Sequence, residues 1–442
     1  MNQFQTQLAE AFGVADITTE TMQTAIQDWY NLYYAVDVPK NENPCQQIPF
    51  TVVQKLNKTM FSEYSATSKD KYAQKILDEL NEAKGKAVQK MMIGGESLIK
   101  PIPMKDGFYF AIVDRNALQI FGRDGQGNLT DVGMYERSMI GNKYFTLLER
   151  RTMDGNGYLR ITNKLYMSKN KDSLGDRVPL TTLGKYELLE DEYIFKQPIF
   201  SIGMASLRMP IENCVDGSAD AVSVYAAAAG LIHLININEA QLAGEFERGE
   251  SRVFASADLL SNKQLKDHLF VGLDEDPDDS KITIFSPQLR EQSFLARKQE
   301  YLRNVESLVG MKRGLLSEVE AVERTATEIT SSEGDYNLTI IQLQRAWEST
   351  MREVMRLCSI LGPMYNVAGS KEINMDDITI DWGDGILYDR DKKWNELKDM
   401  VAVGMLKPEK AIGWYFDLPR ETEEDLQKIR EEYMPEIERL IM

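Results

Sequence analysis

The stretch "VGMKRGLLSEVEAVERTATEIT", residues 309–330, lies between two long segments with helical patterning and decides how they connect. Gly310 follows the last apolar residue of the first segment, and glycine in that place is a helix stop signal. Thr325-Ala-Thr-Glu328 matches a capping box, in which a threonine hydroxyl and a glutamate carboxylate satisfy backbone N–H groups at a helix start. The sequence therefore predicts one helix ending at Gly310, a loop, and a second helix starting at Thr325.

The two segments that flank this loop have the apolar periodicity of amphipathic helices. Ser286-Pro287 is predicted to open the first, since serine is a good cap and proline suits the first helical position. The second is expected to reach Gly362-Pro363, about 35 residues and ~50 Å long, with Gly334 as a potential kink. A strand and turn over 376–392 and two or three amphipathic helices from about residue 393 complete the chain.

The N-terminal half changes its pattern at Gly94-Gly95. Before that point, apolar stripes at helical spacing over 52–61 and 69–91 predict two helices. From there to about residue 200 the chain is rich in aromatic and β-branched residues, and Asp-Gly pairs at 106–107, 124–125 and 154–155 separate the apolar runs. Because glycine supplies the positive φ that tight hairpin turns need, these pairs predict an antiparallel sheet with one buried face.

Helical patterning returns over 218–249, between the sheet and the quoted loop. The alanines at 226–229 and Gly230 allow a neighbouring helix to approach closely, although a helix in the core of one subunit would have the same composition. Three strand-like runs follow: "RVFAS" (252–256), "HLFVGL" (268–273) and "KITIF" (281–285). They predict a small strand-bearing module inserted between two helices.

The composition indicates a globular protein of two to four domains and argues against tight binding of nucleic acid. The chain has 442 residues, 43% of them hydrophobic, and its 51 basic and 69 acidic residues leave a net charge of −18. A protein that grips DNA by neutralising phosphates is expected to be basic instead. Cys45, Cys214 and Cys358 lie far apart and predict neither a disulfide framework nor a CxxC metal site, so a reducing compartment fits best.

Neither a membrane segment nor a reactive constellation emerges from the sequence. The most apolar window, 221–235, is shorter than the roughly 20 residues of a membrane helix and is expected to be a buried helix, with His233 a core histidine. The glycines of "GRDGQG" (122–127) and "GMKRGLL" (310–316) lack the spacing of nucleotide-binding loops. The acidic tract at 274–279 lacks the glycine of a calcium loop, and a solvated turn is expected. We therefore predict no catalytic, cofactor-binding or metal-binding residue, and no enzyme.

The order of these elements, together with particular residues, resembles the portal proteins of long-tailed, siphovirus-type double-stranded DNA bacteriophages and prophages. The likeness extends from about residue 40 to about 415. Its most telling stretch is "RTATEITSSEGD" (324–335), since that family often has Thr-Ala-Thr-Glu where a loop enters the long helix. Also similar are "AQLAGEFERGESRVFAS" (240–256), a helix entering the inserted module, and "ITIDWGDGILYDRDKKWNELKDMVAVGMLKPEKAI" (378–412), a strand and turn followed by a broken helix.

The resemblance implies an α+β portal fold, mainly helical, with an antiparallel sheet in its wing. The wing would comprise residues 1–217 together with the long helix and returning strand over 325–392. The other parts would be stem helices at 218–249 and 286–309, a clip at 250–285, a tunnel loop at 310–324 and a short helical crown at 393–442.

The resemblance also implies which residues form the functional surfaces. The tunnel loop would face DNA with Lys312, Arg313, Glu318, Glu320 and Glu323, the cap would be Thr325 and Glu328, and the clip would meet partners with Asp274, Asp276, Asp278 and Asp279. The loop is expected to be held at both ends and free in the middle. Its two bases would be a local exception in an acidic, non-gripping bore, unless they pair with glutamates of neighbouring loops.

A portal forms a homo-oligomeric ring, usually a dodecamer, at one capsid vertex of the virion, and is assembled in the host bacterial cytoplasm. Its implied partners are double-stranded DNA bound without sequence specificity, the terminase large subunit, a head-completion or adaptor protein, and the major capsid and scaffolding proteins. No cofactor and no membrane is expected. Two alternatives stay open: a ring-forming structural adaptor of a phage-like particle that passes no DNA, and a nucleic-acid-processing enzyme whose site is not evident.

Overall fold

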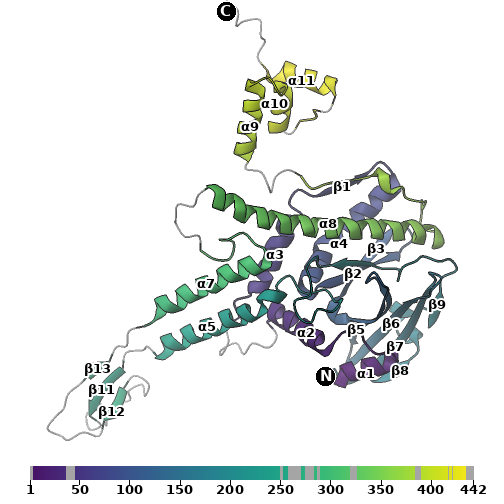
Figure 1. The fold of residues 1–442 in the computed structure, drawn as a ribbon. Helices are drawn as coiled ribbons and strands as arrows, with labels where there is room; N and C mark the ends of the chain where they lie inside the picture. Colours follow the sequence, from purple (N-terminus) through teal and green to yellow (C-terminus); the bar gives the residue numbers. More distant parts are fainter. Residues whose placement is uncertain are drawn as a thin grey trace, which may run out of the picture. The chain divides into compact units, whose positions relative to one another are not determined.

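The computed structural model describes residues 3–35, 45–248, 252–256, 270–273, 283–285, 289–318, 326–383, 390–416, 418–420 and 422–434. The chain divides into two compact units, residues 1–60 with 67–379, and residues 61–66 with 380–442. Figure 1 shows the helices and the strands, and most of the strand pairs are antiparallel. The predicted α+β class is confirmed.

The N-terminal part of the chain, up to residue 94, is mainly helical. It contains α1 (Gln3–Phe12), α2 (Glu20–Tyr34), α3 (Ile48–Met60), the short strand β1 (Ser65–Ser68) and α4 (Lys71–Gly94). Asp70 caps α4, because its carboxylate accepts hydrogen bonds from the N–H groups of Tyr72 and Ala73. The two helices predicted over 52–61 and 69–91 are therefore confirmed as α3 and α4.

A three-stranded antiparallel sheet follows α4, in the order β10-β2-β3. It consists of β2 (Glu96–Pro103), β3 (Phe108–Asp114) and β10 (Ala205–Arg208). Both α4 and the long helix α8 (Ala326–Met364) contact β2. This covering explains why four successive β2 residues, 96–99, are all buried instead of alternating in and out.

The second sheet has six strands, and the sequence predicted two of its hairpin turns, at residues 124–125 and 154–155. Its strands are β4 (Leu118–Arg123), β5 (Leu129–Ile140), β6 (Lys143–Met153), β7 (Leu159–Ser168) and β8 (Asp176–Val178), with β9 (Glu192–Ile194) also paired to β7. In the β4–β5 turn the positive φ occurs at Gly127 (86°), not at Gly125, because the Asp124 carboxylate already holds the N–H groups of Gln126 and Asn128. Gly157 (82°) does the same in the β6–β7 turn. The hairpins are confirmed, and the glycine assigned to their left-handed step is corrected.

The helix predicted over 218–249 begins later than expected. A short 3-10 turn η4 (Ala226–Ala228) precedes α5 (Ala229–Arg248), and residues 218–225 are not helical. Ser223 Oγ and the Val224 N–H each donate to the Met92 carbonyl at 2.9 Å, and Asp220 forms ion pairs with the body. These tertiary bonds outweigh the helical tendency of the segment.

The helix α5 packs along α7 (Glu291–Val309), and the two lie side by side in Figure 1. Asn238 Nδ2 donates to the Phe294 carbonyl at 3.1 Å, and Lys298 pairs with Glu239 at 2.8 Å. Between the two helices in sequence, β11 (Arg252–Ser256), β12 (Phe270–Leu273) and β13 (Thr283–Phe285) form the predicted strand-bearing module, with β11 in the centre. Residues Ser286-Pro287, the predicted start of the second helix, lie outside the described part of the chain.

His233 of α5 is not the core histidine that we expected. Its side chain is half exposed, and Nε2 lies 3.0 Å from Asp28 Oδ1 of α2. Ile232 and Ile235, three residues apart, are buried on one face of α5. Residue 233 points away from that face and is exposed.

The long helix α8 runs through Pro363 and ends at Met364, one residue beyond the predicted end at Gly362-Pro363. Its C-terminal turn is closed by the Val367 N–H, which donates to the Gly362 carbonyl at 2.9 Å, and Asn366 provides the left-handed residue (φ 55°). A strand, β14 (Ile378–Asp381), follows and forms a two-stranded sheet with β1.

The smaller unit carries three C-terminal helices, α9 (Arg390–Ala402), α10 (Pro408–Tyr415) and α11 (Glu423–Tyr433). Thr422 and Asp425 form a complete capping box at the start of α11. The Tyr415 ring contacts two other rings: its centroid lies 4.6 Å from that of Trp394 and 5.1 Å from that of Phe416. The amphipathic helices predicted from about residue 393 are confirmed.

Candidate functional site

The candidate site is the loop that begins at the C-terminal end of α7. Gly310 ends the helix in the left-handed conformation (φ 73°, ψ 32°), and its N–H donates to the carbonyls of Glu306 and Ser307. A Cβ added at Gly310 would lie 2.4 Å from Thr339 Oγ1 of α8. Both the backbone conformation and this close approach require glycine, so the predicted stop at Gly310 is confirmed with its physical reason.

The Glu306 side chain organises the first half of the loop. It is fully buried, with 0% of its surface exposed. Its carboxylate accepts hydrogen bonds from the Gly314 N–H at 3.1 Å, the Ser317 N–H at 2.9 Å and Ser317 Oγ at 2.8 Å, and also from the Leu316 N–H. A ring of backbone donors around a buried carboxylate is a strong arrangement, because hydrogen bonds to an ionised group are roughly twice as strong as neutral ones.

A β-turn over residues 312–315 displays the two bases of the loop. The Leu315 N–H donates to the Lys312 carbonyl at 3.3 Å, which leaves Arg313 and Gly314 at the two corners. Gly314 has a φ of 92°, the left-handed value that a type II turn needs at its second corner. Arg313 is exposed and Lys312 is half-buried.

The first half of the loop is therefore fixed, and the expectation that the loop is free in the middle is wrong for residues 311–318. The Glu318 N–H extends the fixed part by donating to Gln299 Oε1 at 2.8 Å, while the Glu318 residue itself is exposed. This part of the loop is fixed because the buried carboxylate of Glu306 on α7 accepts hydrogen bonds from the N–H groups of residues 314, 316 and 317.

The structure leaves several predicted site residues untested. Glu320, Glu323 and Thr325 lie outside the described residues, as do Asp274, Asp276, Asp278, Asp279 and the side chain of Glu328. Helix α8 begins at Ala326, directly after Thr325, so the predicted helix start is confirmed. Within the described ranges, no group of three or more His, Cys, Asp or Glu side chains is placed to hold a metal ion.

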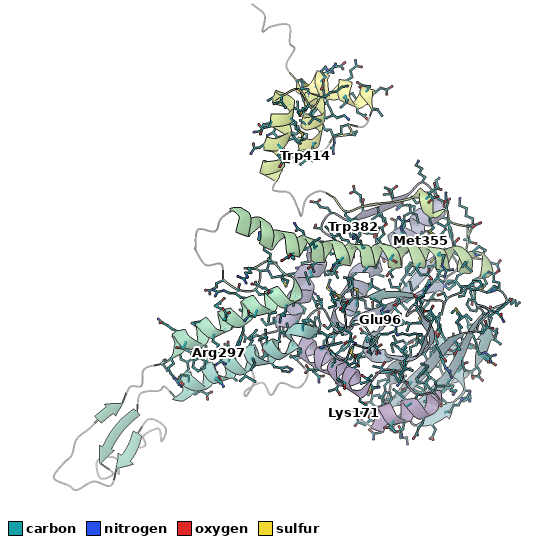
Figure 2. All side chains as sticks on the ribbon, in the orientation of Figure 1. Glu96, Lys171, Arg297, Met355, Trp382 and Trp414 are labelled. Carbon is teal, nitrogen blue, oxygen red and sulfur yellow. The ribbon has the colours of Figure 1, made fainter. Side chains whose placement is uncertain are left out.

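Buried charges in the larger unit join the sheets to the segment that leads into α5. Glu96 of β2, which lies in the interior in Figure 2, pairs with Arg123 at 3.0 Å, and Arg123 also pairs with Asp220 at 3.1 Å. Asp220 further approaches Arg115 at 3.5 Å. Burial alone would raise the pKa of Glu96, but the charges of Arg123 and Arg208 outweigh it and lower the pKa. These ion pairs attach residues 218–225 to the sheets, because Asp220 lies in that segment and has Arg115 and Arg123 as partners.

A cavity of about 580 Å³ opens beside this network, between β10, the β4–β5 turn and α8. Its wall contains three arginines and three acids, and each arginine has an acidic partner: Arg123 and Arg208 approach Glu96 at 3.0 and 3.9 Å, and Arg356 pairs with Glu353 at 2.7 Å. These pairs leave the wall close to neutral, which does not favour an ionic ligand.

Comparison with known proteins identifies the family. The family described as "Phage portal protein, SPP1 Gp6-like" matches residues 136–438, well over half of the chain. The chain belongs to this family. No curated protein matches it. A chain of the solved structure described as "Neck of native GTA particle computed with C12 symmetry" is similar at 11% identity and a TM-score of 0.47, over 92% of this chain and 97% of that one.

Membership confirms the resemblance drawn from the sequence. Portal proteins are structural components of phage particles. The match extends over α5, α7, the loop after α7 and the long helix α8, so the candidate site lies inside the family region. No helix among the described residues has the length and apolarity to cross a membrane.

Sequence reasoning missed Glu306, the residue that organises the first half of the loop after α7. The available signal was its position: it follows Leu302 and Val305 on the apolar face of a predicted helix and precedes Gly310 by four residues. An acidic residue on a buried helix face needs partners, and the segment that follows it directly in sequence is the loop.

Proposed function

We propose that this chain is the portal subunit of a phage-type particle, a ring-shaped conduit at one capsid vertex. Through it a terminase motor would move DNA into the head, and it would later retain and release the genome. The family match carries the proposal. The wing would be residues 1–217 together with 325–392, the stem α5 and α7, the clip the β11–β13 module, the tunnel loop residues 310–324 and the crown α9–α11.

The outer face of α5 supports assembly into a ring. Four exposed residues follow one another at helical spacing on this face: Gly230, Leu234, Ile237 and Gln241. None of them is charged, Leu234 and Ile237 are 41% and 44% exposed, and a Cβ added at Gly230 would meet no atom within 4 Å. Removing apolar surface from water contributes about 25 cal/mol of favourable free energy per Å². A row of exposed apolar side chains therefore favours an interface. A neighbouring copy of α5–α7 is the occupant that a ring would provide.

Assembly is tested by placing charges on that face. Leu234→Glu combined with Ile237→Glu should leave mainly monomers in mass photometry, where the unaltered chain forms rings with an axial hole in negative-stain micrographs. Leu188→Glu is the matched control, because Leu188 is 97% exposed but lies in a surface loop of the wing. Intact rings from the double variant would refute this interface. A monomeric unaltered chain with nuclease or ATPase activity would overturn the portal proposal itself.

The DNA-facing role of the loop is supported by the exposed Arg313 at a turn corner. In an otherwise acidic chain, Lys312 and Arg313 would be the local contact to phosphates. Replacing both by alanine should lower the amount of DNA that particles package or retain, with rings unchanged. Normal packaging by the double alanine variant would contradict this role. Normal packaging after deletion of the loop would favour the structural adaptor that passes no DNA.

The remaining partners would bind other parts of the ring. Head-completion or adaptor proteins and the terminase would meet the clip, where Asp274, Asp276, Asp278 and Asp279 provide acidic groups for a basic partner surface. Capsid and scaffolding proteins would surround the wing during assembly in the host cytoplasm. Pull-down of these partners with a variant carrying asparagine at the four clip positions tests the clip assignment, and undiminished binding would contradict it.

A further inference from the structure

We infer that Glu306 is a positioning residue: it fixes the 312–315 turn, and with it Arg313, at a set place at the end of α7. The inference rests on the proposed function, since DNA in the tunnel is what Arg313 would meet. It deepens that function by naming the residue that holds the contact in place, which is a buried acid and not a member of the DNA-facing surface.

The first step of the argument is that Glu306 and the loop depend on each other. A fully buried carboxylate without partners is costly, whereas here its oxygens accept hydrogen bonds from Gly314, Leu316 and Ser317. None of these donors belongs to the helix that carries the acid. If the loop moves away, the carboxylate loses every partner named here, so the folded loop is the state that the buried charge selects.

The second step is that the contacts enclose the turn from both sides. Before the turn, the Met311 N–H donates to the Glu306 carbonyl at 2.8 Å. At its second corner and after it, Gly314, Leu316 and Ser317 donate to the Glu306 carboxylate. One residue therefore holds both the entry and the exit of the turn, and the backbone of Arg313 between them is fixed although its side chain is exposed.

The third step concerns the assembled ring. Every copy would hold its Arg313 in the same local geometry, so the bases would form a regular belt instead of independently moving charges. A charge on a fixed backbone explores little beyond the reach of its own side chain. The loss of Glu306 should therefore weaken the DNA contact without altering the chemistry of Arg313.

The test starts with Glu306→Gln in the full-length ring. Glutamine is isosteric, but its amide nitrogen cannot accept a hydrogen bond and the negative charge is gone. Hydrogen–deuterium exchange of the peptide that covers residues 311–318 should become about tenfold faster or more, since bonds to a charged acceptor are worth about 1.5–3 kcal/mol. Glu300→Gln is the matched control, because this acid is on the same helix but exposed. Gly314→Ala is a second route to a disturbed turn that keeps Glu306, since φ is 92° there.

The functional arm measures DNA content per particle for E306Q, R313A and the double variant. We expect E306Q and G314A to lower DNA retention in the same direction as R313A, and the double variant E306Q/R313A to be no worse than R313A. A residue that only stabilised the fold would add its own loss to that of R313A.

Each other outcome overturns a specific part. Unchanged exchange in E306Q would refute the inference and leave the portal function standing. Faster exchange with normal DNA retention, while R313A is impaired, would show that the turn need not be fixed, and would also refute it. Normal retention in R313A itself would refute the proposed DNA role of the loop, and the inference with it.

Discussion

The buried Glu149 allows a prediction whose size follows from the structure. Glu149 lies in β6, and its carboxylate accepts a hydrogen bond from Arg151 Nε at 2.7 Å and pairs with Lys100 of β2. Burial alone would raise the pKa of Glu149, but the charges of Arg151 and Lys100 outweigh it and bring the pKa to about 2. The perturbation is Glu149→Gln, which removes the charge and keeps the shape.

The magnitude comes from the difference between the ordinary glutamate pKa of 4.5 and the folded-state pKa of about 2. Each pKa unit corresponds to about 1.36 kcal/mol, so the charged form of Glu149 stabilises the fold by about 3 kcal/mol. Because the folded-state pKa is lowered, this stability is fully present above about pH 4.5 and is lost as the pH falls towards 2. Glutamine cannot titrate, and the variant should lack this part of the acid dependence.

The assay is thermal unfolding of the unaltered chain and the variant between pH 7 and pH 2. At pH 7 the variant should unfold roughly 5–10 °C earlier, from about 3 kcal/mol and about 2–3 °C per kcal/mol for a large domain. The two midpoints should converge below pH 4.5. Glu192→Gln is the control, because its ion pair with Arg160 is about half exposed and is worth less than about 1 kcal/mol. Equal midpoints at pH 7, or a constant difference down to pH 2, would refute the reasoning.

Three further predictions concern other buried groups. A Cβ at Gly362 would lie 2.1 Å from the Tyr72 hydroxyl, so Gly362→Ala should cost about 1–3 kcal/mol, and Tyr72→Phe in the same chain should restore most of it; no recovery in urea unfolding would contradict this contact. Burial raises the pKa of the Cys358 thiol, whereas Cys214 is exposed, so iodoacetamide should label Cys214 in the native chain and Cys358 only after unfolding, as mass spectrometry of the peptides would reveal. Asp220→Ala should cost about 3–5 kcal/mol, because it leaves buried arginine charge without this partner; a change in unfolding midpoint no larger than that of Glu192→Gln would contradict it.

The parts of the fold that the sequence predicted correctly depend on signals within a few residues of each other. The apolar stripes of α3 and α4 repeat once a turn, and the Asp-Gly hairpins bring together strands that are adjacent in sequence. Gly310 ends α7 by its own backbone conformation. Family resemblance added the order of the parts, which no local pattern contains.

The parts that could not be predicted have partners far away in the sequence. Residues 218–225 carry apolar and small residues that suit a helix, but Asp220 meets Arg115 and Arg123, and Ser223 meets Met92. His233 meets Asp28, which is 205 positions earlier. A sequence without an alignment gives no indication of such pairs, because the burial and charge partner of a residue are set by tertiary packing.

The loop lies between these two cases. Glu306 is only 8–11 positions from its donors, yet the pattern of charges in 309–330 gave no hint that an acid before the loop, instead of the acids within it, determines the loop's shape. What distinguishes Glu306 is burial, and burial depends on how α7 packs. The predicted ends of the loop were right because a helix stop and a helix start are local signals. The predicted freedom of its middle was wrong for residues 311–318, because their shape depends on how Glu306 is buried.

A fixed base suits the proposed conduit better than a mobile one. A mobile arginine would lie within contact distance of a phosphate for only part of the time, which would lower the number of phosphates that a ring neutralises on average. A base held by Glu306 stays where it is, and phosphates of one strand pass it at intervals of about 3.4 Å, so each contact breaks as the next forms. On this argument the E306Q ring should retain less DNA and should also resist its movement less. Faster translocation by the E306Q ring than by the E300Q ring, at equal motor activity, is the expected result, and equal rates would contradict the argument.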